Sequence, residues 1–133
     1  MTEEMRVTVS RDADIVTARQ LGRELAAKVG FAGSDLTLIA TAISEVARNI
    51  ISYAENGEIL LGTANRNGRQ GLLVVAQDQG PGIPDIDLAM RDGYSTGRSL
   101  GLGLPGARRL MDEFEIVSEL GRGTTITMRK WRR

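Results

Sequence analysis

Glu45 and Asn49 are the first residues in the chain whose types and spacing could do chemistry. They are four positions apart in the segment 44–49 (SEVARN), so on a helix they lie one above the other on the same face. A carboxylate beside an amide could hold a metal ion or take a proton from a reacting hydroxyl. For an isolated pair with this spacing, a solvated helix edge is the more common interpretation.

Two glycine-rich segments could bring the backbone close to a ligand. Residues 78–82 (DQGPG) follow an apolar run, so Asp78 is expected at a strand end, where its carboxylate could accept a hydrogen bond from an exocyclic amine such as that of adenine. Residues 101–106 (GLGLPG) open a helix, whose N-terminal amides attract anions. Taken alone, the first segment is more often an ordinary turn, and the second could be a flexible loop with a helix start. The segment 101–106 has neither the spacing of a P-loop nor the βαβ context of a dinucleotide-binding fingerprint.

Two later segments could complete such a site. Residues 92–100 (DGYSTGRSL) contain small polar residues and two glycines, which predicts a segment able to open and close over a ligand. Residues 121–125 (GRGTT) are typical of a hairpin turn, and a threonine hydroxyl beside the glycine could also face the ligand.

The residue types that the chain lacks exclude several kinds of chemistry. Without cysteine there is no disulfide, thiolate nucleophile or cysteine metal site, and without histidine there is no Ser-His-Asp triad or phosphohistidine relay. Seventeen Lys and Arg residues balance seventeen Asp and Glu residues, so no bulk charge attracts nucleic acid or an anionic membrane. No signal peptide and no run of ~18 apolar residues are evident. We therefore expect a cytoplasmic protein with no nucleic-acid or membrane partner.

The N-terminal half predicts one strand and two helices. A strand at 5–10 precedes a helix that Asp12 caps and that Gly30 stops after residue 29. Ser34 or Asp35 caps a second helix of about 20 residues, which would be on the order of 30 Å long. Its apolar stripe, at 3.6-residue spacing, consists of Leu36, Ile39, Ile43, Val46 and Ile50.

The C-terminal half predicts two hairpins around a third helix. Strands at 58–64 and 71–77 flank an Asn-Gly turn, and the second is expected at the centre of the sheet because it is apolar on both faces. One short helical turn near 86–90 and a helix at 104–112 precede a closing hairpin of strands at 115–119 and 124–130. Strands and helices cluster separately, which predicts an α+β two-layer sandwich over residues 1–133, a single domain with helices on one face of a mainly antiparallel sheet.

The order of the motifs resembles the GHKL ATP-binding family of gyrase, histidine kinases and MutL, which has the Bergerat-type fold. E-x-x-x-N on a long helix, D-x-G-x-G after a central strand, G-x-G before a helix and G-T in the last hairpin span residues 34–128. Within the family the chain is most similar to the small anti-sigma-factor-type serine kinases, above all the switch kinases of the stressosome. This narrower likeness is carried by residues 41–50 (TAISEVARNI), 78–86 (DQGPGIPDI) and 110–114 (LMDEF).

The resemblance implies an ATP- and Mg²⁺-dependent protein serine/threonine kinase in a partner-switching stress-signalling pathway. Its acceptor would be a serine or threonine of a STAS-domain scaffold or antagonist protein. A PP2C-type phosphatase, activated when the kinase leaves the scaffold, is implied as a second partner. The N-terminal strand and first helix could form a homodimer face, as in related kinases.

The resemblance also implies a role for each residue that matches the family's motifs. Glu45 would act as base toward the acceptor hydroxyl, and Asn49 would bind Mg²⁺. Asp78 would read the adenine amine, with support from Thr124. Arg98 is the nearest candidate for a contact with the γ-phosphate. The glycines fall into two groups, Gly80 and Gly82 shaping the pocket and Gly101 and Gly103 bordering the phosphates.

Two other functions are compatible with the same motifs. An anti-sigma factor would bind and sequester a sigma subunit, with kinase activity serving to release it. A nucleotide-binding module without transferase activity is the third interpretation, and the presence of Glu45 argues against it. The protein that co-purifies, a STAS scaffold or a sigma factor, separates the first two.

Overall fold

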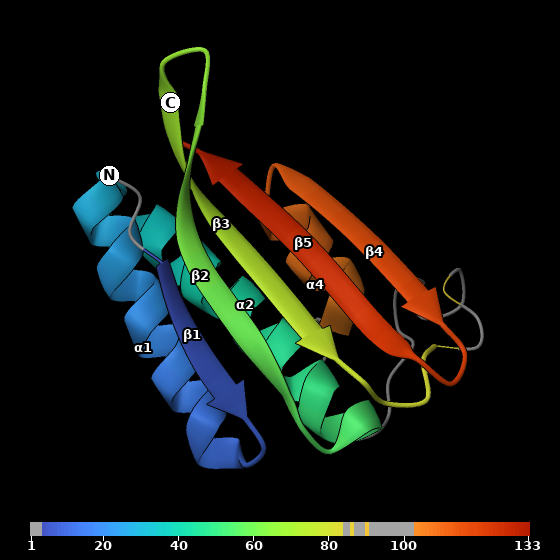
Figure 1. Cartoon of the computed structure of the whole chain (residues 1–133). Coiled ribbons are helices and arrows are strands. Elements are labelled where there is room, and N and C mark those ends of the chain that lie inside the picture. The colour runs from blue at the N-terminus through green and yellow to red at the C-terminus, as the bar shows by residue number, and fades with distance from the viewer. Residues whose placement is uncertain (1–3, 84–85, 87–89, 91–102) are drawn as a thin grey trace.

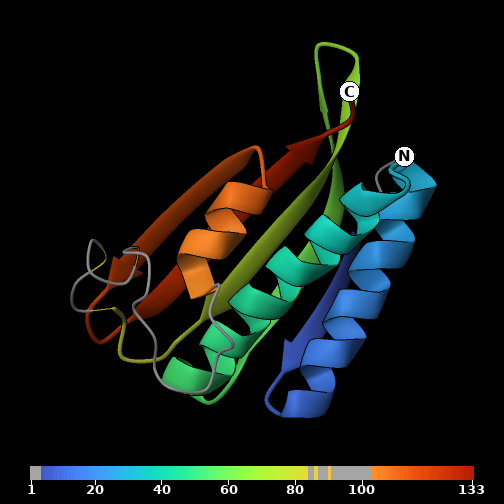
Figure 2. The same cartoon turned by 180° about the vertical axis from the view of Figure 1, so that it is seen from behind.

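The computed structural model describes residues 4–83, 86, 90 and 103–133, which form two layers (Figure 1). Seen from behind, the helices cover one face of the sheet (Figure 2). In chain order the described elements are β1 (Glu4–Val9), α1 (Asp12–Val29), α2 (Ser34–Ala54), β2 (Gly57–Arg66), β3 (Arg69–Asp78), α4 (Gly103–Leu110), β4 (Glu113–Glu119) and β5 (Gly123–Trp131).

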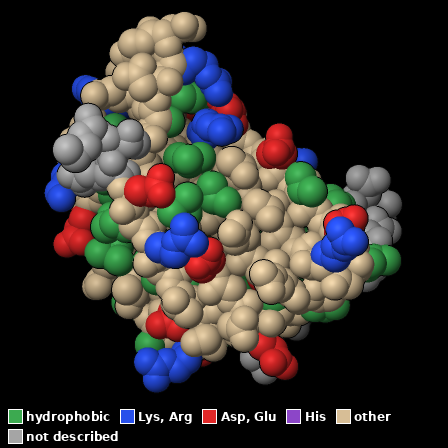
Figure 3. All heavy atoms as spheres, viewed as in Figure 1, with side chains coloured by type: hydrophobic (Ala, Val, Ile, Leu, Met, Phe, Trp, Pro, Cys, Tyr) green, Lys and Arg blue, Asp and Glu red, His purple; other side chains and the backbone are tan. Residues whose placement is uncertain are grey.

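The sheet is antiparallel throughout, with the strand order β1-β2-β3-β5-β4. This confirms the predicted α+β sandwich. β3 is the middle strand, as its apolar character predicted, and its side chains Leu72, Val74 and Ala76 are buried in the core. Figure 3 shows the other face of the sheet, where hydrophobic side chains alternate with charged groups of both signs. The ion pair between Arg6 and Glu58, at 2.7 Å, joins β1 and β2 there.

The two ends of α1 show one wrong prediction and one confirmed prediction. Asp14, not Asp12, caps the start of the helix, because its Oδ2 accepts hydrogen bonds from the Ser10 amide at 2.9 Å and the Arg11 amide at 3.1 Å. The Ser10 amide is the largest cause that lowers the pKa of the Asp14 carboxyl below its ordinary value. Gly30 ends the helix as predicted, with a left-handed φ of 117°.

α2 is the central helix of the layer. Four residues of its predicted stripe are fully buried, and Leu36 is partly buried against the same core. Neither Ser34 nor Asp35 caps it, because the N-cap residue is Gly33 and no side chain bonds the free amides. α1 packs closely on α2 at Gly22, where a Cβ would overlap Ile43 Cδ1.

The β2–β3 hairpin sets the length of the molecule. Asn67 and Gly68 both have positive φ, 54° and 81°, as the predicted two-residue turn requires. The strands are longer than predicted and stay paired from Gly57↔Asp78 at one end to Arg66↔Arg69 at the other. At about 3.3 Å per residue, these two ends lie about 30 Å apart.

The C-terminal elements follow the predicted order. α4 is two residues shorter at its end than predicted, β4 begins two residues earlier, and β5 is one residue longer at each end. The Met90 amide donates to the Ile86 carbonyl at 3.0 Å, as in a turn of helix. The segment 92–100, predicted to close over the site, lies outside the described residues. None of the helices in the described part of the chain has the length and apolar character needed to cross a bilayer.

Candidate functional site

Most of the predicted site residues lie toward one end of the molecule. Figure 1 shows the last turns of α2, the end of β3 and the β4–β5 turn gathered there. α4 packs against α2, and its first residue, Gly103, has a positive φ of 56° (Figure 2). Arg98 and Gly101 lie outside the residues that the structure describes.

Glu45 and Asn49 lie on consecutive turns of α2 at the edge of its apolar stripe. Glu45 is only 8% exposed, and its Oε1 is 3.6 Å from Arg48 Nη1, too far for a hydrogen bond. Asn49 is half-buried, and within the described part of the chain its amide forms no hydrogen bond. The neighbouring Ser44 hydroxyl donates to the Ala40 carbonyl at 2.9 Å. Glu45 and Asn49 therefore present oxygen atoms that are available to a ligand.

Asp78 is the last residue of β3, paired with Gly57 on one side and Thr124 on the other. Its Oδ1 accepts a hydrogen bond from the Gly80 amide at 2.9 Å, which turns the chain sharply after the strand. Among the described residues, nothing donates a hydrogen bond to Oδ2. One carboxylate oxygen thus shapes the segment that follows β3, and the other is available as an acceptor.

Two glycines permit the close packing around Asp78. A Cβ at Gly80 would lie 2.6 Å from the Ala54 Cβ at the end of α2. A Cβ at Gly123 would overlap the Asp78 carbonyl oxygen, and the φ of Gly123 is +116°. Any larger residue at these positions would push α2 or β5 away from the end of β3.

The two halves of the site are connected through α2. Ile50, directly after Asn49, packs at the Gly57–Asp78 pair, because a Cβ at Gly57 would lie 2.9 Å from Ile50 Cγ2 and 3.0 Å from Asp78 Cβ. The structure thus places the turn of α2 that carries Asn49 beside the strand end that carries Asp78.

Ser118 is a residue of the site that sequence reasoning missed. Its Oγ accepts a hydrogen bond from the Ile83 amide at 2.7 Å and shares another with Thr124 Oγ1 at 2.9 Å. The Gly121 amide donates to the Pro81 carbonyl at 2.9 Å. These bonds fasten the segment 78–83 to the β4–β5 hairpin. Only the alternation of β4 could have suggested which face Ser118 takes.

Two other predicted residues take part in this packing. Thr124, 4% exposed, lies beside Asp78 with its hydroxyl bonded to Ser118. Gly82 has a φ of +83° and packs against the backbone of Glu119, whose carbonyl oxygen would lie 2.6 Å from an added Cβ. Both are therefore in position to shape a pocket at the end of β3.

Comparison with known proteins defines the class. Residues 8–130 match the family model of the histidine kinase-like ATPase domain. The chain belongs to this family, as its motifs predicted.

Two relatives indicate which branch of this family the chain resembles. The chain is 50% identical over 133 residues, all of both chains, to the serine/threonine-protein kinase RsbT of Bacillus subtilis (strain 168). It is 36% identical over 101 residues to an anti-sigma F factor of Clostridium kluyveri, covering 72% of this chain and 70% of that one. These relatives confirm the predicted branch of anti-sigma-factor-type kinases.

Two solved structures share the fold. The structure of the RsbU and RsbW domains of Rv1364c from Mycobacterium tuberculosis matches with a TM-score of 0.64 at 24% identity, over all of this chain and 33% of that one. The mycobacterial sensor histidine kinase MprB matches with a TM-score of 0.59 at 18% identity, over 98% of this chain and 99% of that one. At these identities the likeness concerns the fold alone.

The Ser118→Ala substitution should lower the free energy of unfolding by about 1–3 kcal/mol, because it removes the partner of the partly buried Ile83 amide. Urea denaturation measures this change. Thr17→Ala is the matched control, since the Thr17 hydroxyl is exposed and bonds only its own helix at 3.3 Å. The ATP dissociation constant should rise in Ser118→Ala alone. Equal stability and ATP affinity of the two variants would show that Ser118 does not hold the segment.

Proposed function

We propose that the chain is an ATP-dependent protein serine/threonine kinase of a partner-switching stress-signalling pathway. The observation that carries the proposal is the full-length match to RsbT at 50% identity. The geometry supports it, because α2 holds a nearly buried carboxylate, Glu45, one turn from an amide without a hydrogen-bond partner in the described chain, Asn49. Membership of the ATPase family implies that the chain binds ATP.

The proposed acceptor is a serine or threonine of a STAS-domain scaffold or antagonist protein. A PP2C-type phosphatase is the proposed second partner, activated when the kinase leaves the scaffold. Both rest on the resemblance to stressosome switch kinases. A homodimer through β1 and α1 stays a prediction; β1 is an edge strand of the sheet, and the exposed Val16 lies on α1.

Glu45 is the proposed base toward the acceptor hydroxyl. Phosphoryl transfer depends mainly on positioning and charge neutralisation, so a single carboxylate that orients the hydroxyl and takes up its proton suffices. Burial among the apolar residues of α2 limits the positions that the carboxylate can take. Arg48, at 3.6 Å, places a positive charge next to it.

Asn49 is the proposed ligand of Mg²⁺. Magnesium prefers few protein oxygens together with phosphates and waters, and the half-buried Asn49 amide supplies one oxygen that no described group occupies. The residue therefore fits the ion. When bound, Mg²⁺ would neutralise charge on the phosphates of ATP, while this chain orients the acceptor hydroxyl and the nucleotide.

The adenine end of the nucleotide is assigned to the end of β3. Asp78 Oδ2 would accept a hydrogen bond from the adenine amine, with Thr124 at its side. The close-packed Gly80 and Gly82 would form the wall of the pocket. On the phosphate side, we propose Gly103 at the start of α4, together with Gly101 and Arg98 from the segment before it.

The second candidate function is an anti-sigma factor that binds and sequesters a sigma subunit. The observation that favours it is the 36% identity to an anti-sigma F factor. The two functions separate in one experiment, in which the chain is purified from its host with its bound proteins. A STAS-domain protein among them supports the kinase of a partner switch, and a sigma subunit supports the anti-sigma factor.

Glu45→Gln should keep ATP binding but slow phosphoryl transfer by roughly 10²–10⁴-fold, because the amide cannot take up the proton of the substrate's serine or threonine hydroxyl. The measurement is radiolabel transfer from ATP to STAS-domain proteins encoded near this gene, with mass spectrometry of the phosphorylated residue. Glu24→Gln, the same change on the exposed face of α1, is the control and should behave as wild type. Unchanged turnover in Glu45→Gln with an intact fold would remove Glu45 from the mechanism.

Asp78→Asn should weaken ATP binding by about 1.5–3 kcal/mol, the range for a hydrogen bond to a charged group. The wild-type chain should strongly prefer ATP to GTP, because guanine places a carbonyl where adenine has its amine and would face the carboxylate with a second acceptor. Calorimetry with both nucleotides measures both effects, and Asp12→Asn at the exposed start of α1 is the control. Similar wild-type affinities for ATP and GTP would refute the adenine assignment.

A further inference from the structure

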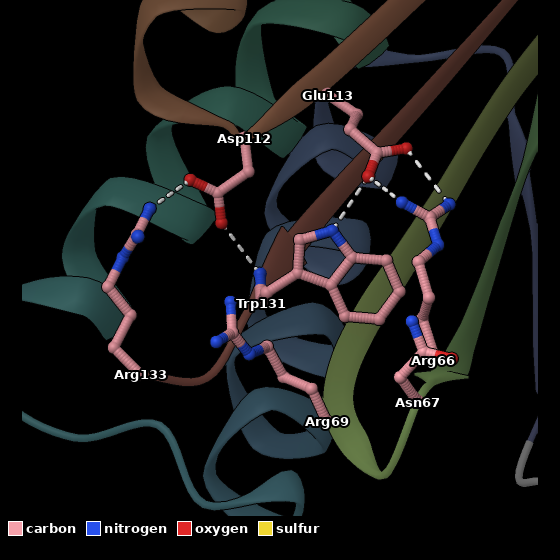
Figure 4. A pocket seen from close by; sticks show the side chains of 7 residues that line it. All are labelled: Arg66, Asn67, Arg69, Asp112, Glu113, Trp131 and Arg133. Atoms are coloured by element: carbon pink, nitrogen blue, oxygen red, sulfur yellow. Dashed lines mark hydrogen bonds and ion pairs between the residues drawn. The ribbon is translucent and has the colours of Figure 1, made fainter.

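A pocket lies at the end of the β2–β3 hairpin that is far from Asp78. It has a volume of about 490 Å³ and forms where the β2–β3 turn meets the start of β4 and the end of β5 (Figure 4). Its lining consists of Arg66, Asn67, Arg69, Asp112, Glu113, Trp131 and Arg133. The functional assignments above use none of these residues.

Trp131 is the fixed centre of this pocket. Its indole Nε1 donates a hydrogen bond to Glu113 Oε2 at 2.7 Å, and the Arg66 guanidinium lies over the ring, 4.7 Å from its centroid. Arg66 Nη1 also bonds Glu113 Oε2 at 2.6 Å. The bond from Arg66, and after it the bond from Trp131, hold the pKa of the Glu113 carboxyl below its ordinary value. The indole is 9% exposed, so the pocket presents a rigid aromatic wall.

Positive charge is concentrated around this wall, although the whole chain is neutral. The segments 66–69, 112–113 and 129–133 together contain six Lys and Arg residues but only two acids, Asp112 and Glu113. Both acids are already engaged, Glu113 by two arginines and Asp112 by Arg133 at 2.5 Å. The excess positive charge therefore has no local acidic partner left.

Arg69 is the side chain of this cluster best placed to meet a ligand. It is exposed, it lines the pocket, and within the described chain it forms neither an ion pair nor a hydrogen bond. Arg132 lies next to Gln70, because its amide donates to the Gln70 carbonyl at 2.9 Å. Its guanidinium bonds the neutral Gln70 side chain at 3.3 Å. Arginine and tryptophan, together with tyrosine, are enriched among the residues that contribute most to binding at protein interfaces.

We propose that this pocket is a docking site for an acidic segment of the protein that the kinase phosphorylates. Its arginines would pair with aspartate and glutamate side chains of that segment, and Trp131 would pack against their aliphatic parts. The inference rests on the proposed kinase function for the identity of the partner. The chemistry of the site, an arginine-rich wall around one tryptophan, stands on the structure itself.

The geometry allows one partner to contact both ends of the molecule. The pocket and Asp78 are separated by the length of the β2–β3 hairpin, about 30 Å. A globular partner of about 100 residues has a radius of gyration of about 13 Å, so its span is comparable to this distance. Docking at Arg69 would hold the acceptor hydroxyl near Glu45 at a raised local concentration.

The first test uses Trp131 as the reporter, because it is the only tryptophan in the chain. The probe is a ten-residue peptide of alternating Asp and Glu, and the comparison peptide has Asn and Gln at the same positions. We expect the acidic peptide alone to change the Trp131 fluorescence of the wild-type chain. Arg69→Glu should weaken its binding at least about tenfold, and Arg69→Ala by a smaller factor.

Arg19→Glu is the matched control, because it makes the same change of net charge on the exposed face of α1. It should bind the acidic peptide as the wild type does. Equal affinities of Arg69→Glu and Arg19→Glu, or an equal response to the neutral peptide, would overturn the docking site.

The second test measures phosphorylation of the STAS-domain protein at saturating Mg·ATP. Arg69→Glu should raise KM for the protein substrate about tenfold, with kcat and the ATP dissociation constant unchanged. The same KM in Arg69→Glu and Arg19→Glu would overturn the docking of the substrate. If the wild type phosphorylates no partner, the proposed function fails, and the peptide titration alone then decides whether the pocket binds acidic segments.

Discussion

The contact between Gly123 and the end of β3 is the constraint on which the site depends. No side chain fits between them, because a Cβ at Gly123 would overlap the Asp78 carbonyl oxygen. β5 therefore begins directly against Asp78, which places Thr124 opposite it in the sheet. From that position the Thr124 hydroxyl reaches Ser118, and Ser118 holds the Ile83 amide. The lack of a side chain at Gly123 thus allows the end of β3, the segment after it and the β4–β5 hairpin to pack together.

α2 extends this arrangement to the groups that would carry out the chemistry. The helix is anchored by fully buried residues, and it ends against Gly80 and the Gly57–Asp78 pair through Ala54 and Ile50. Glu45 and Asn49 therefore cannot shift along the helix axis without disturbing the core. In the proposed function, the end of the sheet would bind adenine, and the helices would hold the phosphates. Close packing between the two layers keeps Asn49 on α2 at a fixed distance from Asp78 at the end of β3.

Local sequence patterns predicted the fold. The contacts of Ser118 and the pocket around Trp131 depend on pairing between distant segments. The apolar stripe of α2, the two-faced apolar run of β3 and the Asn-Gly turn each depend on neighbours in sequence, so the sequence alone was sufficient for them. The cap of α1 was predicted at Asp12 and found at Asp14, because capping depends on the direction in which the chain arrives from Ser10. The role of Ser118 and the pocket around Trp131 arise only when the sheet register joins residues far apart in sequence, 35 positions for Ser118 and Ile83 and 47 for Arg66 and Glu113. No local pattern contains that information.

The most direct measurement is an amide-resolved NMR titration of the chain with Mg²⁺ and a non-hydrolysable ATP analogue. We expect the chemical-shift changes to concentrate at residues 78–83, at 121–124 and in the last turns of α2. The amide chemical shifts of the β2–β3 turn, about 30 Å away, should not change. Shifts centred on the turn at 66–69, or an absence of shifts at 78–83 under saturating nucleotide, would contradict the assignment of the nucleotide to the end of β3.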